Sequence, residues 1–567
     1  MVRIVRTVCQ MCGTTYGGCG IDVHVKNGRI EKIEGTKGHP VNDGRLCAKG
    51  LAAMQLQYAP NRLRYPMKKV RGKTNGQWER ISWDEAYDII ISNLQEIIKK
   101  DGARGISWLK GQAPGWESNW NWCQRFMNAI GSPNIATPGH NCHVARMIAH
   151  THTYGWEPDP DYENTRCMLL WGYNPFNTSM SHVGSRIMRA KQKGAMLIVV
   201  DPRFSRTAAK ADIYVQLRPG TDGALALAML NVIIEEGLYD KGFVDKWTYG
   251  FDQLHRWLKQ YTPEWAEKIT WVPTGTIRKI ARTYATNKPA TLCEGNGLDQ
   301  QPNVVQAVRA LSILVTITGN LDIPGGNVIN PQAPPFSKTA PMSLRNMSDE
   351  AITKAYRNSV SKHILKFRLE YCTLPELVDA ILTDRPYAIR AMIVQGMNPA
   401  IIGSNTKRIR NALNKVPFLV VFDPFMSTTA DLADIVLPAA TFFERTLLVA
   451  RQKPRVEAQY YQLARKVVEP LGECKSDYDF ISELTKRMGY DEAFPWKGVD
   501  EAIDHQLKPI GLSYKMLENH PEHVIVQKYP AEKLYRKYGQ CFSLLPTNKA
   551  ELYSCLLYTS PSPRDRS

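Results

Sequence analysis

Apolar and polar residues follow one another in short blocks along most of the chain. Six apolar blocks have the length and composition of buried β-strands. They are MLLWG (168–172), MLIVVD (196–201), DIYVQL (212–217), AMIVQG (391–396), FLVVFD (418–423) and ADIVLP (433–438). Repeats with helical spacing, such as 223–237 and 303–319, separate them. This alternation predicts α/β domains with mostly parallel sheets.

Two further patterns predict elements near the N-terminus. Residues 21–35 alternate between apolar and polar side chains on both sides of Asn27-Gly28, a pair that is typical of a tight β-hairpin turn. Ser82 stands just before an apolar helical repeat, with Glu85 in the position that completes a capping box, and Gly102 predicts the end of that helix.

Composition narrows the class of protein. The chain has 567 residues, of which 43% are hydrophobic, so it is too long for one ordinary core and too apolar for a disordered protein. No run of 18 apolar residues occurs, so we expect no membrane insertion. The first residues contain neither an apolar signal core nor a twin-arginine pair, and we therefore expect a cytoplasmic protein. The net charge of +18 favours acidic partners such as phosphorylated cofactors, although a basic solvated surface explains it as well.

Four of the twelve cysteines are grouped near the N-terminus. Cys9, Cys12 and Cys19 fall within eleven residues of a glycine-rich loop, and Cys47 follows with 27 residues between. A four-iron cluster needs a thiolate at each corner, whereas structural zinc sites usually draw their ligands from two CxxC pairs. The spacing therefore favours a 4Fe-4S cluster, with zinc as the alternative. Lys49, two residues after Cys47, either raises the potential of such a cluster or is an ordinary surface lysine.

The residues that follow four of the predicted strands repeat a pattern. Two strands run into Gly-x-Asn-Pro (172–175 and 396–399) and two into Asp-Pro (201–202 and 423–424). Ligands of open α/β sheets bind at the carboxyl ends of strands, where glycine admits a phosphate and an acidic side chain accepts from a sugar or base. The recurrence predicts two related nucleotide sites. In the segment RPGTD (218–222), Asp222 either reads a guanine edge or caps the following helix.

Taken together, these motifs make the chain resemble a known family. The cysteine loop with Lys49, the strand endings, and the segments GTDGALALAML, TGNLDIPGGN and STTADLADIVLPAATFFER are similar to those of the molybdopterin oxidoreductases of the dimethyl sulfoxide reductase superfamily, over residues 3 to about 554. The resemblance implies a small N-terminal iron–sulfur domain and two doubly wound α/β domains with mostly parallel sheets. The implied divisions are 1–60 (4Fe-4S domain), 61–165 plus 335–495 (first α/β domain), 166–334 (second α/β domain), 496–554 (connector toward the family's C-terminal β-barrel, which is missing here) and 555–567 (non-native tail).

The resemblance also implies the cofactors and their ligands. The cofactors are a 4Fe-4S cluster and bis(molybdopterin guanine dinucleotide), whose four pterin sulfurs hold Mo or W. The cluster ligands would be Cys9, Cys12, Cys19 and Cys47. One dinucleotide would be bound by Gly172, Asn174, Asp201, Arg203, Gly220 and Asp222, and the other by Gly396, Asn398 and Asp423.

By the same resemblance, Cys142 would complete the coordination of the metal, His143 would move a proton there, and Lys49 would bridge pterin and cluster. A thiolate suits a metal already surrounded by sulfur, and an imidazole titrates close to neutral pH. The alternatives are that Cys142 is one more buried cysteine and that His143 is a structural histidine.

The expected function is a molybdenum- or tungsten-dependent, two-electron redox step on a small substrate such as an oxyanion or a sulfur compound. The cluster would relay electrons to a partner iron–sulfur subunit, with a membrane-anchor subunit as a further option and no nucleic acid as a partner. A formate dehydrogenase-like enzyme is one alternative, because that group also has a Cys-His pair such as Cys142-His143. A metal-free electron-transfer subunit with the same fold is the other.

Four departures from the family pattern bear on this expectation. The spacer between Cys12 and Cys19 is longer than the commonest one, so the loop is expected to bulge. The Arg-Gly-Gln-Asn-Asn segment of formate dehydrogenases is absent from 332–343, and Gly13 stands where acetylene hydratases place an acid. The missing barrel implies a truncated chain whose activity is in doubt.

Overall fold

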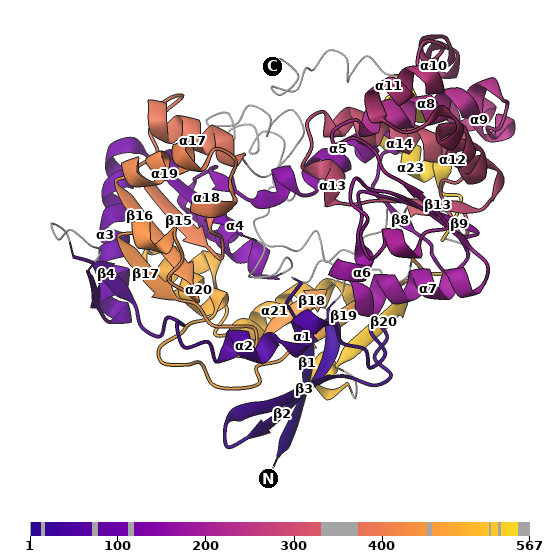
Figure 1. Ribbon diagram of the computed structural model, residues 1–567. Coiled ribbons are helices and arrows are strands. Elements are labelled where there is room, and N and C mark those ends of the chain that lie inside the picture. Colours follow the sequence, from indigo (N-terminus) through magenta and orange to yellow (C-terminus); the bar gives the residue numbers. More distant parts are fainter. Residues whose placement is uncertain are drawn as a thin grey trace. The chain divides into compact units, whose positions relative to one another are not determined.

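The structure is a computed structural model that describes residues 2–12, 18–70, 77–111, 118–329, 372–450, 456–520, 523–530 and 534–553 (Figure 1). The chain divides into two compact units. The first unit comprises Met1–Pro138, Pro334–Gln452 and Tyr460–Val526, and the second comprises Gly139–Ala333, Lys453–Gln459 and Gln527–Ser567. The first segment of the predicted first α/β domain, 61–165, extends beyond the division between Pro138 and Gly139.

The first unit begins with a small antiparallel sheet. Strands β1 (Arg3–Cys9), β2 (Cys19–Lys26) and β3 (Arg29–Gly35) pair in that order. Asn27 and Gly28 form the turn between β2 and β3 with φ of 50° and 74°, a conformation that these two residue types tolerate well. The predicted hairpin is therefore confirmed. Two short helices follow, α1 (Ala48–Leu51) and α2 (Ala53–Gln57).

A mostly parallel sheet forms the core of the first unit (Figure 1). Its strand order is β5-β4-β17-β16-β15-β6-β7, in which β4 and β5 run antiparallel to their neighbours. The bounds are β4 (Met67–Lys69), β5 (Trp78–Arg80), β6 (Ile106–Lys110), β7 (Ile135–Ala136), β15 (Ala391–Gln395), β16 (Phe418–Asp423) and β17 (Ile435–Pro438).

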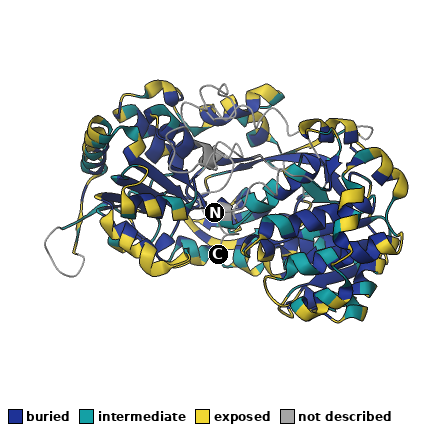
Figure 2. Ribbon diagram, turned by 90° about the horizontal axis from the view of Figure 1, so that it is seen from above, coloured by how far each residue is buried: buried dark blue, intermediate teal, exposed yellow. Residues whose placement is uncertain are grey.

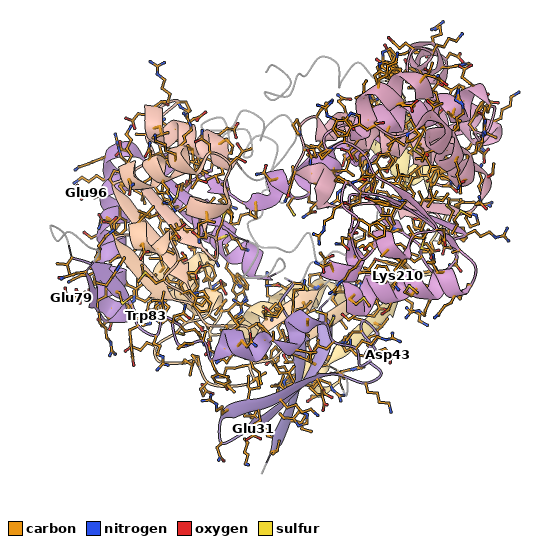
Figure 3. All side chains as sticks on the ribbon, in the orientation of Figure 1. Glu31, Asp43, Glu79, Trp83, Glu96 and Lys210 are labelled. Atoms are coloured by element: carbon orange, nitrogen blue, oxygen red, sulfur yellow. The ribbon has the colours of Figure 1, made fainter. Side chains whose placement is uncertain are left out.

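Helices cover both faces of this sheet. On one face lie α3 (Trp83–Asp101), α4 (Ser118–Ile130) and α20 (Asp477–Arg487), and on the other lie α17 (Leu374–Thr383), α18 (Pro399–Ile402) and α19 (Thr406–Lys415). Helix α3 begins as predicted, because the Ser82 hydroxyl accepts a hydrogen bond from the Glu85 N–H at 3.0 Å. Its polar face carries Glu96, which projects outward (Figure 3).

The second unit is built on a parallel sheet with the strand order β11-β10-β9-β13. The bounds are β9 (Cys167–Trp171), β10 (Met196–Val200), β11 (Ile213–Val215) and β13 (Ala290–Glu294). One face is covered by α5 (Val144–Tyr154), α8 (Asp222–Glu235), α12 (Thr274–Thr286) and α14 (Val304–Ile317), and the other by α6 (Pro175–Thr178) and α7 (Ser185–Gln192).

The remaining elements complete the two units. In the second unit they are β8 (Pro158–Pro160) with β14 (Asn327–Ile329), β12 (Thr248–Tyr249) with β21 (Ala550–Glu551), and α9 (Lys241–Trp247), α10 (Phe251–Leu258), α11 (Pro263–Thr270), α13 (Asn296–Asp299) and α23 (Tyr538–Cys541). A further sheet contains β18 (Leu447–Ala450), β19 (Ala458–Ala464) and β20 (Val524–Lys528), with α21 (Val499–Leu507) and α22 (Tyr514–Asn519) nearby in the sequence.

All six predicted strands are present. Strands β9, β15 and β17 are buried throughout, β10 and β16 are buried except at one end, and β11 is partly buried; buried residues are dark blue in Figure 2. Strand β11 is shorter than predicted, because Asp212 at its start turns its carboxylate to the Leu197 N–H at 2.7 Å. Among the described residues, none of the helices combines the length and apolarity needed to cross a bilayer.

Candidate metal centre and dinucleotide sites

The four N-terminal cysteines are positioned by β1, β2 and α1. Cys9 and Cys19 are direct partners at the end of the β1-β2 ladder, and Cys47 is the N-cap of α1. Burial raises the pKa of the Cys9 thiol to about 12; the Met11 N–H opposes this rise, while the other three thiols, Cys12 included, add to it. A thiol whose pKa is raised by burial and by neighbouring thiols ionises when a metal centre neutralises the charge of the thiolates. This donor set therefore fits an iron–sulfur cluster.

The other possible metal ligands, the loop between Cys12 and Cys19, and Lys49 complete the description of this region. Within the described stretches of the chain, no three His, Cys, Asp or Glu side chains come close enough together to hold one metal ion. The segment 13–17, where the sequence predicts a bulge, lies outside the described residues. Lys49 is half-buried on α1, two residues after Cys47.

Cys142 lies immediately before helix α5 in the second unit. The N–H groups of Cys142 and His143 both donate to the Gly139 carbonyl, at 3.1 and 3.0 Å, which holds the two residues at the start of the helix. The Nδ2 of Asn296 donates a hydrogen bond to the Cys142 Sγ at 3.5 Å. Burial raises the pKa of Cys142, and this hydrogen bond lowers it. A half-buried thiol with a donor directed at its sulfur suits a thiolate ligand better than a core position.

The imidazole of His143 is held by an acidic side chain. Its Nε2 lies 2.7 and 2.9 Å from the two carboxylate oxygens of Glu157. Burial raises the pKa of Glu157, but the charge and hydrogen bond of His143, together with the charges of Arg146 and His150, outweigh it and hold this pKa well below its usual value. Both side chains are about one-third exposed. His143 therefore has one ring nitrogen fixed by a carboxylate and lies beside the candidate metal ligand.

Further charged groups lie along the same helix. Arg146 forms an ion pair with Asp299 at 3.1 Å and donates to the Glu294 carbonyl. His150, one turn later, lies 3.3 Å from the Glu294 carboxylate. Burial raises the pKa of Asp299 to about 6, against the opposing attraction of Arg146. The neighbourhood of Cys142 is thus rich in groups that can hold or release protons.

In the second unit, the residues predicted for one dinucleotide follow the carboxyl ends of β9, β10 and β11. Gly172 has φ of 57°, and the Asn174 Oδ1 accepts a hydrogen bond from the Thr207 hydroxyl at 2.7 Å. Asp201 accepts from the Arg203 N–H at 2.8 Å, and burial raises the pKa of its carboxyl.

Asp222 is the first residue of α8, and the N-cap position belongs to Thr221. Its carboxylate accepts instead from the Trp171 Nε1 at 2.8 Å, so it does not act as the N-cap. Burial raises the pKa of Asp222, and the negative charge of Asp201 adds to that rise because the two carboxyl groups lie at the same edge. Gly220 is exposed just before them, with φ of 81°.

In the first unit, the residues predicted for the other dinucleotide follow β15 and β16. Gly396 has φ of 56°, and the Asn398 Oδ1 accepts from the Thr429 hydroxyl at 2.7 Å. Asp423, the last residue of β16, accepts from the Phe425 N–H at 2.9 Å. Burial raises the pKa of this carboxyl to about 6.

The two edges repeat the same backbone geometry. The strand order β13-β9-β10-β11 of the second unit corresponds to β6-β15-β16-β17 of the first. After β13, a Cβ on Gly295 would lie 2.3 Å from the Gly172 oxygen, and after β6, a Cβ on Gly111 would lie 1.9 Å from the Gly396 oxygen. Only glycine fits this close approach, so the turn is held in one form in both units. Two copies of one phosphate-binding edge suit two copies of one ligand.

Several residues of these sites were not found from the sequence. Glu157 and Asn296 carry no local motif that connects them with Cys142 or His143. Thr207 and Thr429 could have been found, because each is the first residue of a repeated segment, TAAKADI and TADLADI.

Comparisons with known proteins agree in family and fold. Residues 62–487 match the family described as Molybdopterin oxidoreductase, and residues 2–59 match the Molybdopterin oxidoreductase Fe4S4 domain. Acetylene hydratase of Syntrophotalea acetylenica is 31% identical, over 96% of this chain and 77% of that protein. The F420-dependent formate dehydrogenase subunit alpha of Methanocaldococcus jannaschii is 34% identical, over 91% and 75%. The thiosulfate reductase molybdopterin-containing subunit PhsA of Salmonella typhimurium is 28% identical, over 99% and 77%.

Among solved structures, acetylene hydratase from Pelobacter acetylenicus superposes with a TM-score of 0.83 at 29% identity, covering 98% of this chain and 78% of that one. These matches confirm the predicted α/β fold with its N-terminal iron–sulfur domain, and both kinds of cofactor, molybdopterin and a 4Fe-4S cluster. The chain therefore belongs to the molybdopterin oxidoreductase family.

Proposed function

We propose that this chain is a catalytic subunit that carries out a two-electron redox step on a small oxyanion or sulfur compound at a molybdenum or tungsten ion. The observation that carries this proposal is the pair Cys142 and His143, a thiol with a hydrogen-bond donor at its sulfur beside an imidazole fixed by a carboxylate. A soft ligand and a proton-transfer group in adjacent positions are what such a reaction needs.

The residues of the chain divide among the cofactors. We assign the cluster to Cys9, Cys12, Cys19 and Cys47, and the metal to Cys142. One guanine dinucleotide is assigned to Gly172, Asn174, Asp201, Arg203, Gly220 and Asp222, and the other to Gly396, Asn398 and Asp423. When bound, the metal would supply the two-electron chemistry, and Lys49 would be the residue that joins the cluster and the pterin. The twofold occurrence of the Asn–Thr hydrogen bond supports the assignment of two equivalent ligands.

His143 handles the proton of the substrate in this proposal. Glu157 engages its Nε2, which leaves Nδ1 as the ring nitrogen that can take up or release a proton at the substrate. The Asn296 N–H, directed at the Cys142 Sγ, stabilises the thiolate form of that ligand. Close to Cys142 and His143 in the second unit, Arg146 and Asp299 form a further ion pair.

Electrons enter or leave one at a time through the cluster, because a single 4Fe-4S cluster stores one electron. A two-electron turnover therefore needs a further carrier, and we propose an iron–sulfur electron-transfer subunit as the partner, with a membrane-anchor subunit as a third component. Two of the relatives are themselves named as subunits. We place the protein in the cytoplasm.

A formate dehydrogenase-like activity is the second candidate. It is favoured by the adjacent Cys142 and His143 and by the formate dehydrogenase relative, which is 34% identical. The segment 332–343, in which the sequence lacks the arginine motif of that group, lies outside the described residues.

Metal analysis and a substrate panel test the proposal on anaerobically purified protein. We expect about one Mo or W and about four iron atoms per chain, with turnover of thiosulfate, dimethyl sulfoxide or another oxyanion or sulfur compound. Turnover of formate alone would favour the second candidate, turnover of acetylene would point to a hydratase, and iron without Mo or W would point to an electron-transfer subunit.

Variants make the ligand assignment testable. Cys142→Ala should abolish turnover and lower the content of bound Mo or W. Cys541→Ala, the same change at a fully buried cysteine of α23, should leave both unchanged. Equal turnover of the Cys142→Ala variant and the unaltered protein would contradict the assignment.

A further inference from the structure

A chain of buried polar side chains begins at the cysteine loop of the first unit. Gln10 follows Cys9 directly, and its Oε1 accepts a hydrogen bond from the Arg445 Nη2 at 3.2 Å. Arg445 in turn forms an ion pair with Asp477, the first residue of α20. The hydrogen bond to Gln10 is made by Arg445, so the positive member of this pair is the one joined to the cysteine loop.

The chain of contacts continues to the turn assigned to a dinucleotide. The Asp477 Oδ1 accepts from the Gln395 Nε2 at 2.6 Å, and the Gln395 Oε1 accepts from the Trp108 Nε1 at 3.0 Å. Gln395 is the last residue of β15 and directly precedes Gly396. Asp477 is thus held by Arg445 at Oδ2 and by Gln395 at Oδ1, which fixes the direction of the Arg445–Asp477 dipole.

Burial strengthens the electrostatic effect of the Arg445–Asp477 pair on its surroundings. Gln10, Arg445 and Asp477 are 5%, 7% and 3% exposed. Charges that are shielded from water interact over longer distances, because the surroundings screen them weakly. In the described part of the chain, the Gln10 Nε2 is buried and has no hydrogen-bond partner. A buried donor next to Cys9 needs an acceptor, and cluster sulfur is one.

We propose that the Arg445–Asp477 pair sets the reduction potential of the 4Fe-4S cluster, with Gln10 as the positioning residue that joins the pair to the cysteine loop. Reduction adds one negative charge to the cluster. Arg445, the member joined to the cysteine loop, stabilises that charge and raises the potential, while Asp477 offsets part of this effect. The inference rests on the proposed assignment of Cys9 as a cluster ligand.

The proposal makes predictions of opposite sign for the two partners. Arg445→Gln leaves Asp477 without its cation and should lower the midpoint potential, whereas Asp477→Asn leaves Arg445 without its anion and should raise it. Each single change should shift the reduction equilibrium by at least tenfold, about 59 mV for a one-electron couple. The double variant Arg445→Gln/Asp477→Asn should return to within about threefold of the unaltered protein, because it removes both charges.

The measurement is a redox titration of the cluster followed by electron paramagnetic resonance, on the full chain purified without oxygen. Arg282→Gln breaks the exposed pair with Glu236 in the second unit and should leave the potential unchanged. Arg445→Lys keeps the charge and should stay closer to the unaltered protein than Arg445→Gln.

A purely structural role predicts loss of stability without shifts of opposite sign. If the Arg445→Gln variant loses its cluster, the Asp477→Asn variant alone provides the test. An unchanged or lowered cluster potential in that variant overturns the inference. If both variants keep a normal cluster and neither change shifts its potential, the inference is wrong and the proposed function still stands. A protein that binds Mo or W but no iron overturns the cluster assignment and this inference together.

Discussion

The Nε2 of His143 lies 2.7 Å from one carboxylate oxygen of Glu157 and 2.9 Å from the other. Glu157→Gln keeps the shape of this side chain but removes its charge, so the imidazole loses the partner that orients it. We expect turnover to fall about 10- to 100-fold, as for other partners of groups near a metal. Steady-state kinetics with the best substrate of the panel measure the loss.

The control for this change is Glu235→Gln. Glu235 contacts His255 at 2.9 Å in the same unit, on the surface. It should not alter turnover, and neither variant should alter the bound Mo or W. An unchanged rate for Glu157→Gln would mean that His143 does not need this carboxylate.

Thr207→Val and Thr429→Val test the duplicated dinucleotide edge. Each removes the hydroxyl that donates to Asn174 or Asn398 at 2.7 Å, while the size of the buried side chain is kept. Loss of a buried donor costs about 1 kcal/mol or more and frees the asparagine to turn. We expect each variant to retain less guanosine monophosphate, released by acid hydrolysis and counted per chain by chromatography.

The matched control is Thr286→Val, at the exposed end of α12, where the hydroxyl donates to the Arg282 carbonyl. It should leave the nucleotide content unchanged. Equal contents in all three variants would argue against the role of the Asn–Thr pairs.

The buried carboxyl of Asp423 should make the free energy of unfolding of the cofactor-free protein depend on pH. Burial raises its pKa to about 6 in the folded chain, whereas an unfolded aspartate ionises near about 4. The folded state therefore binds the proton more tightly, so this contribution to stability is full below about pH 4 and is lost as the pH rises through about 6. Asp423→Asn should stabilise the apoprotein at pH 7, by on the order of 2 kcal/mol, and the gain should shrink toward pH 4.

Thermal melts of the apoprotein between pH 4 and pH 7 check this expectation. Asp88→Asn, an exposed position on α3, serves as the control and should melt like the unaltered protein at each pH. A melting temperature of Asp423→Asn that is lower at pH 7 than that of the unaltered protein would contradict the sign.

The ion pair of Arg62 and Glu444 is fully buried, with an N–O distance of 2.8 Å. Glu444→Gln leaves a buried guanidinium without its counter-charge, so the free energy of unfolding should fall by about 3–5 kcal/mol. Glu236→Gln breaks the exposed pair with Arg282, and there the loss should stay below about 1 kcal/mol. Urea unfolding of both variants gives the comparison, and equal losses would show that burial does not control this pair.

Local patterns of the sequence predicted much of the fold. The six strand blocks, the Asn27-Gly28 hairpin and the start of α3 at Ser82 are all present. The hairpin turn and the helix start depend on interactions between residues near one another in the chain, such as the Ser82 hydroxyl with the Glu85 N–H, and the strands are marked by their apolar runs. The repeated strand endings also predicted two related edges, because a glycine with positive φ and an asparagine leave a local mark.

The partners of the candidate site lie beyond such patterns. Asn296 reaches Cys142 across 154 residues, and Glu157 reaches His143 from the far end of α5. Asp222 had two interpretations in the sequence, and the structure directs its carboxylate to Trp171, the last residue of β9.

The sequence by itself determined where the six predicted strands, the Asn27-Gly28 turn and the start of α3 occur, and which family chemistry the cysteine loop and the strand endings belong to. Tertiary structure alone decided which side chains meet: Glu157 with His143, Thr429 with Asn398, and Arg445 with Gln10. The physical reason is that apolar runs, turns and helix starts are marked by residues close together in the chain, whereas these hydrogen bonds form only after packed sheets and helices have brought distant segments together.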